Sequence, residues 1–308
     1  MSVGTTFPCC ERVDGGCRSP RNCGFVVLPL QCCCSIVIRL LDFHQGFKMV
    51  NFSVVVPAYK ECGNIKPLTE RLFAAFEKSG IGAKNAELVI VDDNSKDGSV
   101  EAVQGLSPTY NVRILVRTTE RGLSSAVIHG IKNAKGAFIL VMDADLQHPP
   151  ETVPKLFDAL QKPGIEFVLG TRYGAGVAID KDWPIHRRII SWGARILARP
   201  LTPLSDPMSG FFGLRRDVFA RGENRVSPIG YKIALELFVK CRIKKYDEVG
   251  FSFATRTVGE SKLTGKVIVH YLKHLRALYR YSYGSFVVIL LLLLAAAVFF
   301  VFFAVFLN

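Results

Sequence analysis

The sequence predicts an α/β fold built on a mostly parallel, doubly wound sheet. From Phe52 onward, short apolar runs rich in β-branched residues alternate with longer stretches of helical periodicity. This alternation is typical of parallel strands joined by helices that cover both faces of a sheet. The chain has 308 residues, which is enough for one large domain or two small domains with a buried core.

The individual elements follow from the same periodicity. The apolar runs predict strands over residues 52–56, 87–91, 112–116, 137–142 and 166–169. Helices are expected between them, over 64–78, 99–106, 122–134 and 150–161. The Gly-containing segment 174–182 predicts a mobile loop. A further helix is expected over 187–199, before the Pro- and Gly-containing segment 200–213. Residues 49–263 are therefore expected to form the main domain.

Two carboxylates follow the strand predicted over 137–142, in the sequence Asp143-Ala144-Asp145. In open α/β sheets, ligands bind outside the carboxyl ends of the strands. Two carboxylates in that place are costly unless a cation binds them, and a divalent cation holding a substrate diphosphate fits the position. Because Asp is also common at helix caps, the pair alone leaves both a metal site and a simple turn open.

The ends of the first two predicted strands are polar as well. Pro57 ends strand pairing because it has no N–H, while Tyr59 and Glu61 offer a ring for stacking and a hydrogen-bond acceptor. Asp92 and Asp93 follow the second strand. Each loop by itself is explained as a strand-to-helix turn. Three acid-bearing strand ends at one edge of a sheet favour a polar ligand.

Residues 286–307 form an unbroken apolar run without charge, Gly or Pro. These 22 residues, at about 1.5 Å each, are long enough to cross the ~30 Å hydrocarbon core of a bilayer. A core helix rarely needs such length or is apolar on all sides. The run therefore predicts one C-terminal transmembrane helix.

The net charge of +13 is explained better by a membrane surface than by nucleic acid, for which no sequence motif is present. Basic residues that precede the apolar run mark the cytosolic side and attract anionic lipid: Lys262, Lys266, Lys273, Arg276 and Arg280. Over 264–285, apolar residues recur at helical spacing opposite basic ones, which predicts an amphipathic helix on the membrane surface. A helix whose apolar face packs on the core is the alternative.

Residues 1–48 differ from the rest of the chain. Seven of the nine cysteines lie in the first 34 residues, but no Cys-x2–4-Cys pair indicates a zinc site. Only Cys62 and Cys241 follow, which suits a reducing compartment. A signal peptide or anchor, a lipidated leader, and a disordered or absent leader with Met49 as the start are the alternatives. The composition favours the last of these.

The polar blocks together resemble a known family. In chain order they are VVVPAYKE, VDDNSKDGS, GLSSAVIHG, MDADLQHPPE, LGTRY, SDPMSGFFGLRR and RTVGESKL. Over about residues 52–263 they are similar to the inverting family-2 glycosyltransferases, most closely to the dolichol-phosphate mannosyltransferases. The resemblance implies a glycosyltransferase-A (Rossmann-like) domain that transfers mannose from GDP-mannose to dolichyl phosphate. It also implies the cytosolic side of the endoplasmic reticulum membrane, and a product used for N-glycan, GPI-anchor and O-mannose synthesis.

The resemblance implies roles for individual residues. Those expected to hold GDP-mannose are Pro57, Tyr59, Glu61, Val91, Asp93, Asp143, Ala144, Asp145, Arg172, Arg256 and Lys262. Those expected to bind Mg2+ or Mn2+ are Asp143, Asp145 and Gln147, and those expected to bind the acceptor phosphate are Arg172, Arg187 and Ser191. Asp145, Arg172 and Lys262 are the expected catalytic residues. Arg188 is a rival to Arg187, and His148 is expected behind the metal ligands or facing solvent, because hard cations prefer oxygen.

The chemistry of such a transfer agrees with these residue types. A leaving GDP develops negative charge, which a cation and fixed Arg or Lys donors stabilise. A lipid monophosphate has a second pKa of about 6, so it is largely ionised at neutral pH and needs no strong general base. The same chemistry with UDP-glucose and a non-catalytic nucleotide-sugar-binding membrane subunit stay open as alternatives. The sequence does not indicate accessory subunits.

Overall fold

The computed structural model describes residues 50–173, 185–252 and 265–307, without the side chains of residues 185–189 and of part of the last helix. The predicted leader 1–48, the predicted loop 174–182 and the predicted site residues Arg256 and Lys262 lie outside the described residues.

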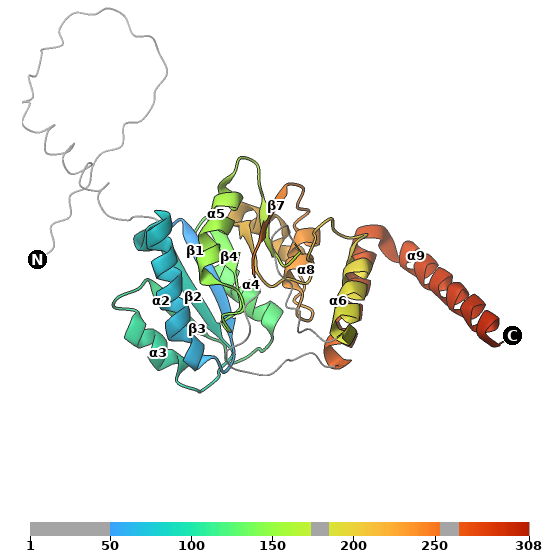
Figure 1. Cartoon of the computed structure of the whole chain (residues 1–308), viewed down its shortest axis with the longest axis horizontal. Coiled ribbons are helices and arrows are strands. Elements are labelled where there is room, and N and C mark those ends of the chain that lie inside the picture. Colours follow the sequence, from blue (N-terminus) through green and yellow to red (C-terminus); the bar gives the residue numbers. More distant parts are fainter. Residues whose placement is uncertain (1–49, 174–184, 253–264, 308) are drawn as a thin grey trace, which may run out of the picture. The chain divides into compact units, whose positions relative to one another are not determined.

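A seven-stranded sheet in the order β3-β2-β1-β4-β6-β5-β7 forms the centre of the domain (Figure 1). Its strands are β1 (Phe52–Ala58), β2 (Ala86–Asp92), β3 (Val112–Val116), β4 (Phe138–Val141), β5 (Phe167–Thr171), β6 (Phe212–Arg215) and β7 (Tyr246–Gly250). Neighbouring strands are parallel except at β6, which runs antiparallel to both β4 and β5. Strands β1 to β5 therefore end at one edge of the sheet, and β6 begins at that edge.

Helices cover both faces of the sheet. Phe52, Val54 and Val56 of β1 belong to one core and Val55 to the other, because side chains alternate along a strand. The first core is covered by α2 (Cys62–Ser79), α3 (Ser99–Leu106) and α5 (Val153–Gln161), and the second by α4 (Leu123–Asn133), α7 (Arg216–Gly222) and α8 (Ile233–Lys240). Short 3-10 helices lie at Ala83–Asn85, Pro150–Thr152 and Glu223–Arg225. A Cβ on Gly130 would lie 2.3 Å from Val55 Cγ1, so glycine allows α4 its close approach to β1.

The predicted α/β fold with a mostly parallel sheet is confirmed. Every strand and helix predicted up to residue 169 is present in the structure. The sequence did not predict β6, α7, α8 or β7, and residues 212 and 213, interpreted as part of a Pro- and Gly-containing segment, begin β6.

The last two long helices pack on α8. These are α6 (Ile185–Ala198) and α9 (Gly265–Leu307). Their buried contact consists of Ala198, Leu235, Leu275 and Leu278. One face of the predicted amphipathic segment 264–285 therefore packs on the domain, as the alternative to a membrane-surface helix predicted. Other apolar residues of the same segment stay exposed: Ile268, Val269 and Leu272.

Helix α9 is interrupted at Gly284, whose φ of 79° and ψ of 169° are not helical. The interruption lies just before the predicted membrane segment 286–307. In the part of the chain that the structure describes, we find no helix with both the length and the apolar character needed to cross a bilayer. The transmembrane helix and the domain boundaries stay predictions.

Candidate active site

The loops after β1, β2 and β4 meet at one edge of the sheet, since β1 lies between its two neighbours with Ala58 opposite Asp92 and Val55 opposite Val141. Four residues in these loops have left-handed backbone angles although they are not glycine: Lys60, Asn94, Lys96 and Leu146. Such angles cost about 1–3 kcal/mol each and cluster where function requires an unusual backbone. The strain therefore agrees with a functional site at this edge.

Hydrogen bonds connect the first loop to the second. The backbone N–H of Lys60 donates to Ser95 Oγ at 2.9 Å. The backbone N–H of Ser95 in turn donates to Asp92 Oδ2 at 2.9 Å, and its hydroxyl donates to Oδ1. Tyr59 extends beyond these bonds and is 41% exposed, with the Arg121 guanidinium 5.6 Å from its ring centroid. The Tyr59 ring is thus accessible for stacking.

Three other residues predicted to hold the nucleotide lie around the same loop. Pro57 and Val91 are opposite one another on β1 and β2, and Val91 is fully buried. Glu61 Oε2 accepts a hydrogen bond from Asn64 Nδ2 at 2.7 Å, in the first turn of α2. The structure places these residues together, and their binding roles stay predictions.

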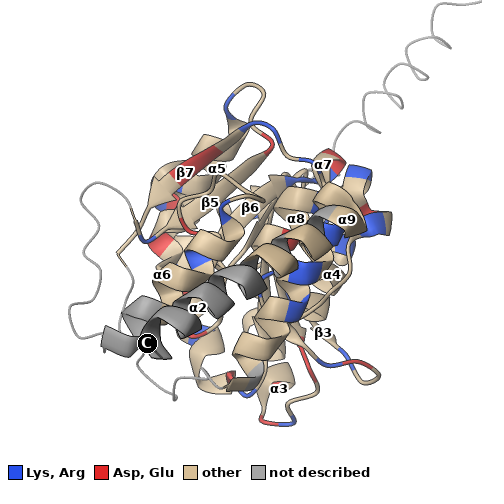
Figure 2. Ribbon diagram, turned by 90° about the vertical axis from the view of Figure 1, so that its right-hand side faces the viewer, with Lys and Arg blue, Asp and Glu red and all other residues tan. Residues whose placement is uncertain are grey.

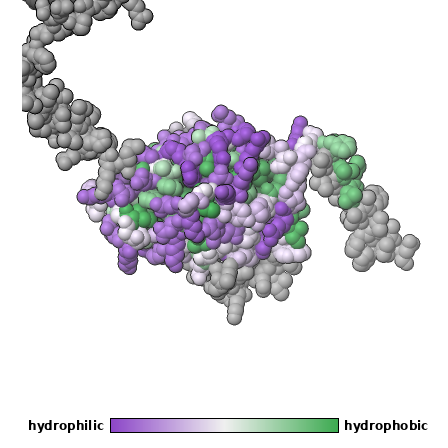
Figure 3. Space-filling model, turned by 90° about the horizontal axis from the view of Figure 1, so that it is seen from above, coloured by the Kyte–Doolittle hydropathy of each residue, from purple (hydrophilic) through white to green (hydrophobic). Residues whose placement is uncertain are grey.

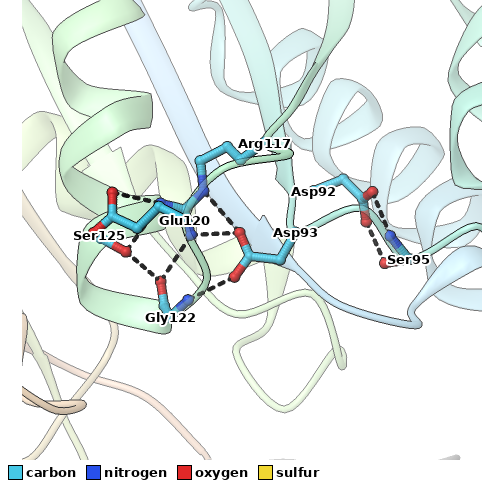
Figure 4. A network of polar contacts seen from close by, with 7 residues as sticks. All are labelled: Asp92, Asp93, Ser95, Arg117, Glu120, Gly122 and Ser125. Atoms are coloured by element: carbon cyan, nitrogen blue, oxygen red, sulfur yellow. Dashed lines mark hydrogen bonds and ion pairs between the residues drawn. The ribbon is translucent and has the colours of Figure 1, made fainter.

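Asp93 belongs to a buried network at the end of β2 (Figure 4). Its Oδ1 accepts hydrogen bonds from Arg117, from Nε at 2.7 Å and from Nη2, and its Oδ2 accepts one from the Gly122 N–H at 2.8 Å. Arg117 also donates to Ser125 Oγ at 2.9 Å and to the Gly122 carbonyl at 3.1 Å. Gly122 has a φ of 140°, which favours glycine. Asp93 therefore holds the start of α4 and keeps about one acceptor position for a ligand.

The turn after β4 carries the predicted metal ligands. The side chain of Asp143 is 42% exposed, while Asp145 is 8% exposed and accepts the Gln147 N–H at 3.2 Å. Leu146 has a φ of 61° and packs on the core, which anchors the turn. Hard divalent cations prefer oxygen, and Mg2+ often takes one or two carboxylates together with substrate phosphates. The set of two carboxylates and one amide fits such an ion, although no three His, Cys, Asp or Glu residues gather as a metal site among the described residues.

His148 is buried behind this turn. It is 2% exposed, stacks on Phe211 at a centroid distance of 4.9 Å, and accepts the Asp143 N–H on Nδ1 at 3.0 Å. Burial lowers the pKa of His148 in spite of the nearby carboxylates, so the imidazole is neutral with its proton on Nε2. The solvent-facing alternative for His148 is therefore wrong, and its place behind metal ligands stays a prediction, as the ligands themselves do.

Arg172 follows β5 and forms a bidentate ion pair with Asp206. The distances are 2.7 Å from Nε to Oδ2 and 3.0 Å from Nη2 to Oδ1. The side chain of Asp206 is fully buried, and that of Arg172 is 17% exposed. Burial opposes the charge of Arg172, but the bonds to Asp206 outweigh it and raise its pKa. Arg172 is therefore a fixed cation, and its partner Asp206 was not predicted.

A short segment before β6, residues 206–210, connects Arg172 to the turn after β4; we call it the 206–210 turn. Besides the bond from Asp206 to Arg172, the Met208 carbonyl accepts a hydrogen bond from Lys232 Nζ at 3.1 Å. A Cβ on Gly210 would lie 3.4 Å from both carboxylate oxygens of Asp143. Three charged side chains from separate elements therefore lie around these five residues.

The residues predicted to bind the acceptor phosphate lie beside Arg172 and on α6. Ser191 Oγ is 3.3 Å from the Tyr173 hydroxyl, and the Arg195 guanidinium lies 3.9 Å from the Tyr173 ring centroid. These contacts connect α6 to the residue directly after Arg172. Arg187 is four positions before Ser191 on α6, but its side chain lies outside the described residues.

Comparison with known proteins agrees with this arrangement. A model of the glycosyl transferase family 2 matches residues 53–222. The chain belongs to this family. The prediction that this family 2 member is a glycosyltransferase is thereby confirmed.

The resemblance to the dolichol-phosphate mannosyltransferases is also confirmed. The chain is 56% identical over 237 residues to the dolichol-phosphate mannosyltransferase of Mycosarcoma maydis, covering 76% of this chain and 80% of that protein. It is 56% identical over 243 residues to that of Saccharomyces cerevisiae, covering 77% and 90%.

A solved structure shares the fold. Glucosyl-3-phosphoglycerate synthase from Mycobacterium tuberculosis, in complex with Mn2+, uridine diphosphate and phosphoglyceric acid, aligns with a TM-score of 0.53 at 18% identity. The alignment covers 74% of this chain and 77% of that one. At this identity the likeness concerns the fold alone.

Proposed function

We propose that this family 2 glycosyltransferase transfers mannose from GDP-mannose to dolichyl phosphate, with inversion, and forms dolichyl β-D-mannosyl phosphate. The observation that carries this proposal is the 56% identity to two dolichol-phosphate mannosyltransferases over about three quarters of the chain. The site supports it, because acidic strand ends suited to a metal diphosphate lie beside a fixed guanidinium suited to phosphate.

The donor nucleotide would lie over the loops after β1, β2 and β4. Tyr59 offers an exposed ring for the base, and Asp143, Asp145 and Gln147 would hold Mg2+ or Mn2+. When bound, such an ion neutralises charge on the diphosphate as the bond to the sugar breaks. The oxygen donor set and the exposure of Asp143 support this placement.

The acceptor phosphate would bind at Arg172. Asp206 holds the guanidinium with both oxygens, so the orientation of Arg172 is set before substrate arrives and little reorganisation is needed. An ionised phosphate oxygen attacks the anomeric carbon in line with the leaving diphosphate and needs no general base. Arg187 and the Ser191 hydroxyl would complete the acceptor site, and Arg256 and Lys262 would close over the donor diphosphate.

We propose further that residues 286–307 span the endoplasmic reticulum membrane and that 264–285 lie at its cytosolic surface. Figure 2 shows basic residues along α9. Three of them are exposed: Lys273, Arg276 and Arg280. Hydrophobic side chains are exposed farther along α9 (Figure 3): Phe286, Ile289, Leu290, Leu293 and Leu294. Trp192 on α6 is 63% exposed. A basic and apolar surface of this kind supports contact with anionic lipid and access to a lipid acceptor.

The test is a transfer assay with the full chain in membranes, offering labelled GDP-mannose and UDP-glucose in parallel with dolichyl phosphate. We expect mannosylated lipid that depends on Mg2+ or Mn2+ and has the β configuration. Transfer of glucose without transfer of mannose would show that the donor is UDP-glucose and not GDP-mannose. Binding of the sugar nucleotide without transfer of either sugar would indicate the non-catalytic alternative.

A further inference from the structure

Lys232 is a charged residue of the site that the motifs did not reveal. It is the N-cap residue of α8, and its Nζ reaches back to the Met208 carbonyl of the 206–210 turn at 3.1 Å. The same turn contacts Arg172 through Asp206 and lies beside Asp143 at Gly210. Lys232 therefore contacts the segment that lies between Asp143, in the turn after β4, and the guanidinium of Arg172.

The partners of Lys232 do not balance its charge. An ammonium group has three N–H donors, and among the described residues the one hydrogen bond of the Lys232 ammonium group goes to a neutral carbonyl. No carboxylate of the described residues forms an ion pair with it within 4.0 Å. Burial and the nearby positive charge of Arg172 lower the pKa of Lys232, while Asp206 and Asp143 act in the opposite direction at longer range.

The other charges of the site already have partners. Arg172 is matched by Asp206, and in the proposed function Asp143 and Asp145 share their charge with a divalent cation. Among the described residues that contact the 206–210 turn, Lys232 is then a positive charge without a carboxylate partner. A partly buried cation without a counter-ion is unfavourable in the free protein, and such costs are typical of sites in which the ligand supplies the missing charge.

We propose that Lys232 is a phosphate-binding residue, whose ammonium group donates to an anionic phosphate oxygen during transfer. This inference rests on the proposed function. The oxygen belongs either to the donor diphosphate, held over Asp143, or to the acceptor phosphate, held at Arg172. Lys232 lies next to both of these phosphate positions. An experiment that measures donor binding and acceptor use separately distinguishes them.

The experiment compares Lys232→Met and Lys232→Gln with wild type in the full chain. The Gln variant keeps a donor for the Met208 carbonyl and removes the charge, whereas Met removes both. The matched control is Lys162→Met, which removes an exposed lysine paired with Asp247. In the donor arm, calorimetry measures the Kd of GDP with Mg2+ and again with EDTA. In the acceptor arm, KM for dolichyl phosphate is measured at saturating GDP-mannose, and Tm is recorded for every variant.

We expect either the Kd for GDP or the KM for dolichyl phosphate to rise by about 10- to 100-fold in both Lys232 variants. This is the size expected for loss of a hydrogen bond between charged groups. Lys162→Met should leave both arms unchanged. Because burial disfavours the ammonium group, Tm should stay level or rise in Lys232→Met. A weaker Kd for GDP that persists in EDTA assigns the diphosphate, and a raised KM for dolichyl phosphate assigns the acceptor.

The proposal is overturned if Lys232→Gln matches wild type in both arms, or if Lys232→Met lowers Tm while Lys232→Gln restores every property. In either case Lys232 only supports the 206–210 turn. If wild type binds GDP but transfers no mannose, the proposed function fails by itself, and the donor arm still decides whether Lys232 contacts phosphate.

Discussion

His274 of α9 lies 2.8 Å from Glu236 of α8, measured from Nε2 to Oε2, and both residues are 1% exposed. Glu236 also pairs with Lys240 at 2.9 Å. One turn earlier on α8 is Lys232, which contacts the 206–210 turn. The helix that leads toward the predicted membrane segment is thus connected to the proposed phosphate site through a single helix, α8.

Replacing Glu236 by Gln should destabilise the protein by about 3 kcal/mol or more, because it leaves buried Lys240 without its counter-ion. Burial opposes the charge of Glu236, but the bonds from His274 and Lys240 outweigh it and lower its pKa from the ordinary value. A carboxylate with a lowered folded-state pKa contributes stability above its unfolded pKa, and this stability disappears as pH falls through the folded pKa. The difference in Tm between wild type and Glu236→Gln should therefore be largest at neutral pH and should disappear in acid.

The control is Glu236→Gln combined with Lys240→Met, which removes both charges. It should recover much of the lost stability, because the unpaired ammonium group is gone. A double variant as unstable as the single one would assign the loss to His274 and the Ser227 N–H, which donates to Glu236 at 2.7 Å.

Asp206→Asn should lower kcat/KM about 10- to 100-fold, because Arg172 loses the bidentate acceptor that fixes its orientation. The measurement is steady-state transfer, with dolichyl phosphate varied. Arg172→Lys should have a similar effect, since an ammonium group cannot form the two parallel bonds. If the two residues act as one unit, the double variant is no worse than either single variant. Additive losses would contradict this.

Asp145→Ala should reduce transfer by at least about 100-fold, because the cation that stabilises the leaving diphosphate loses a ligand. EDTA should reduce wild-type transfer similarly, and added Mg2+ or Mn2+ should restore it. Asp158→Ala, on α5 outside the site, is the control for loss of a carboxylate. Full transfer by Asp145→Ala would show that the metal assignment is wrong.

The elements and residues that the sequence predicted are those set by local rules. Strands β1 to β5 follow from short apolar runs, and the polar ends follow from the parallel sheet, so Asp93 and Asp143 could be placed at one edge in advance. Arg172 was assigned by the resemblance alone. Contacts between distant segments could not be read in this way. Arg172 meets Asp206 34 positions later, and Lys232 meets Met208 24 positions earlier. The antiparallel strand β6 brings the 206–210 turn to this edge. It has four residues, which are too few to show a periodicity in the sequence.

Arg117 provides the last prediction, which concerns how Asp93 acts. The resemblance assigned Asp93 to the nucleotide, whereas its carboxylate already accepts three hydrogen bonds from Arg117 and Gly122. We expect Asp93 to act mainly by holding the loop before α4. Arg117→Met and Asp93→Asn should then weaken GDP binding to a similar degree, and each should cost about 3–5 kcal/mol of stability by breaking a buried ion pair.

Calorimetry with GDP and denaturant unfolding of both single variants and the double variant measure this directly. A shared role predicts that the double variant binds GDP no more weakly than Asp93→Asn, with a coupling energy well above the ~0.5 kcal/mol expected for independent sites. Arg113→Met is the matched control, since Arg113 pairs with Glu87 on the same two strands but toward their other ends. GDP affinity that falls in Asp93→Asn but not in Arg117→Met would restore direct contact between Asp93 and the nucleotide.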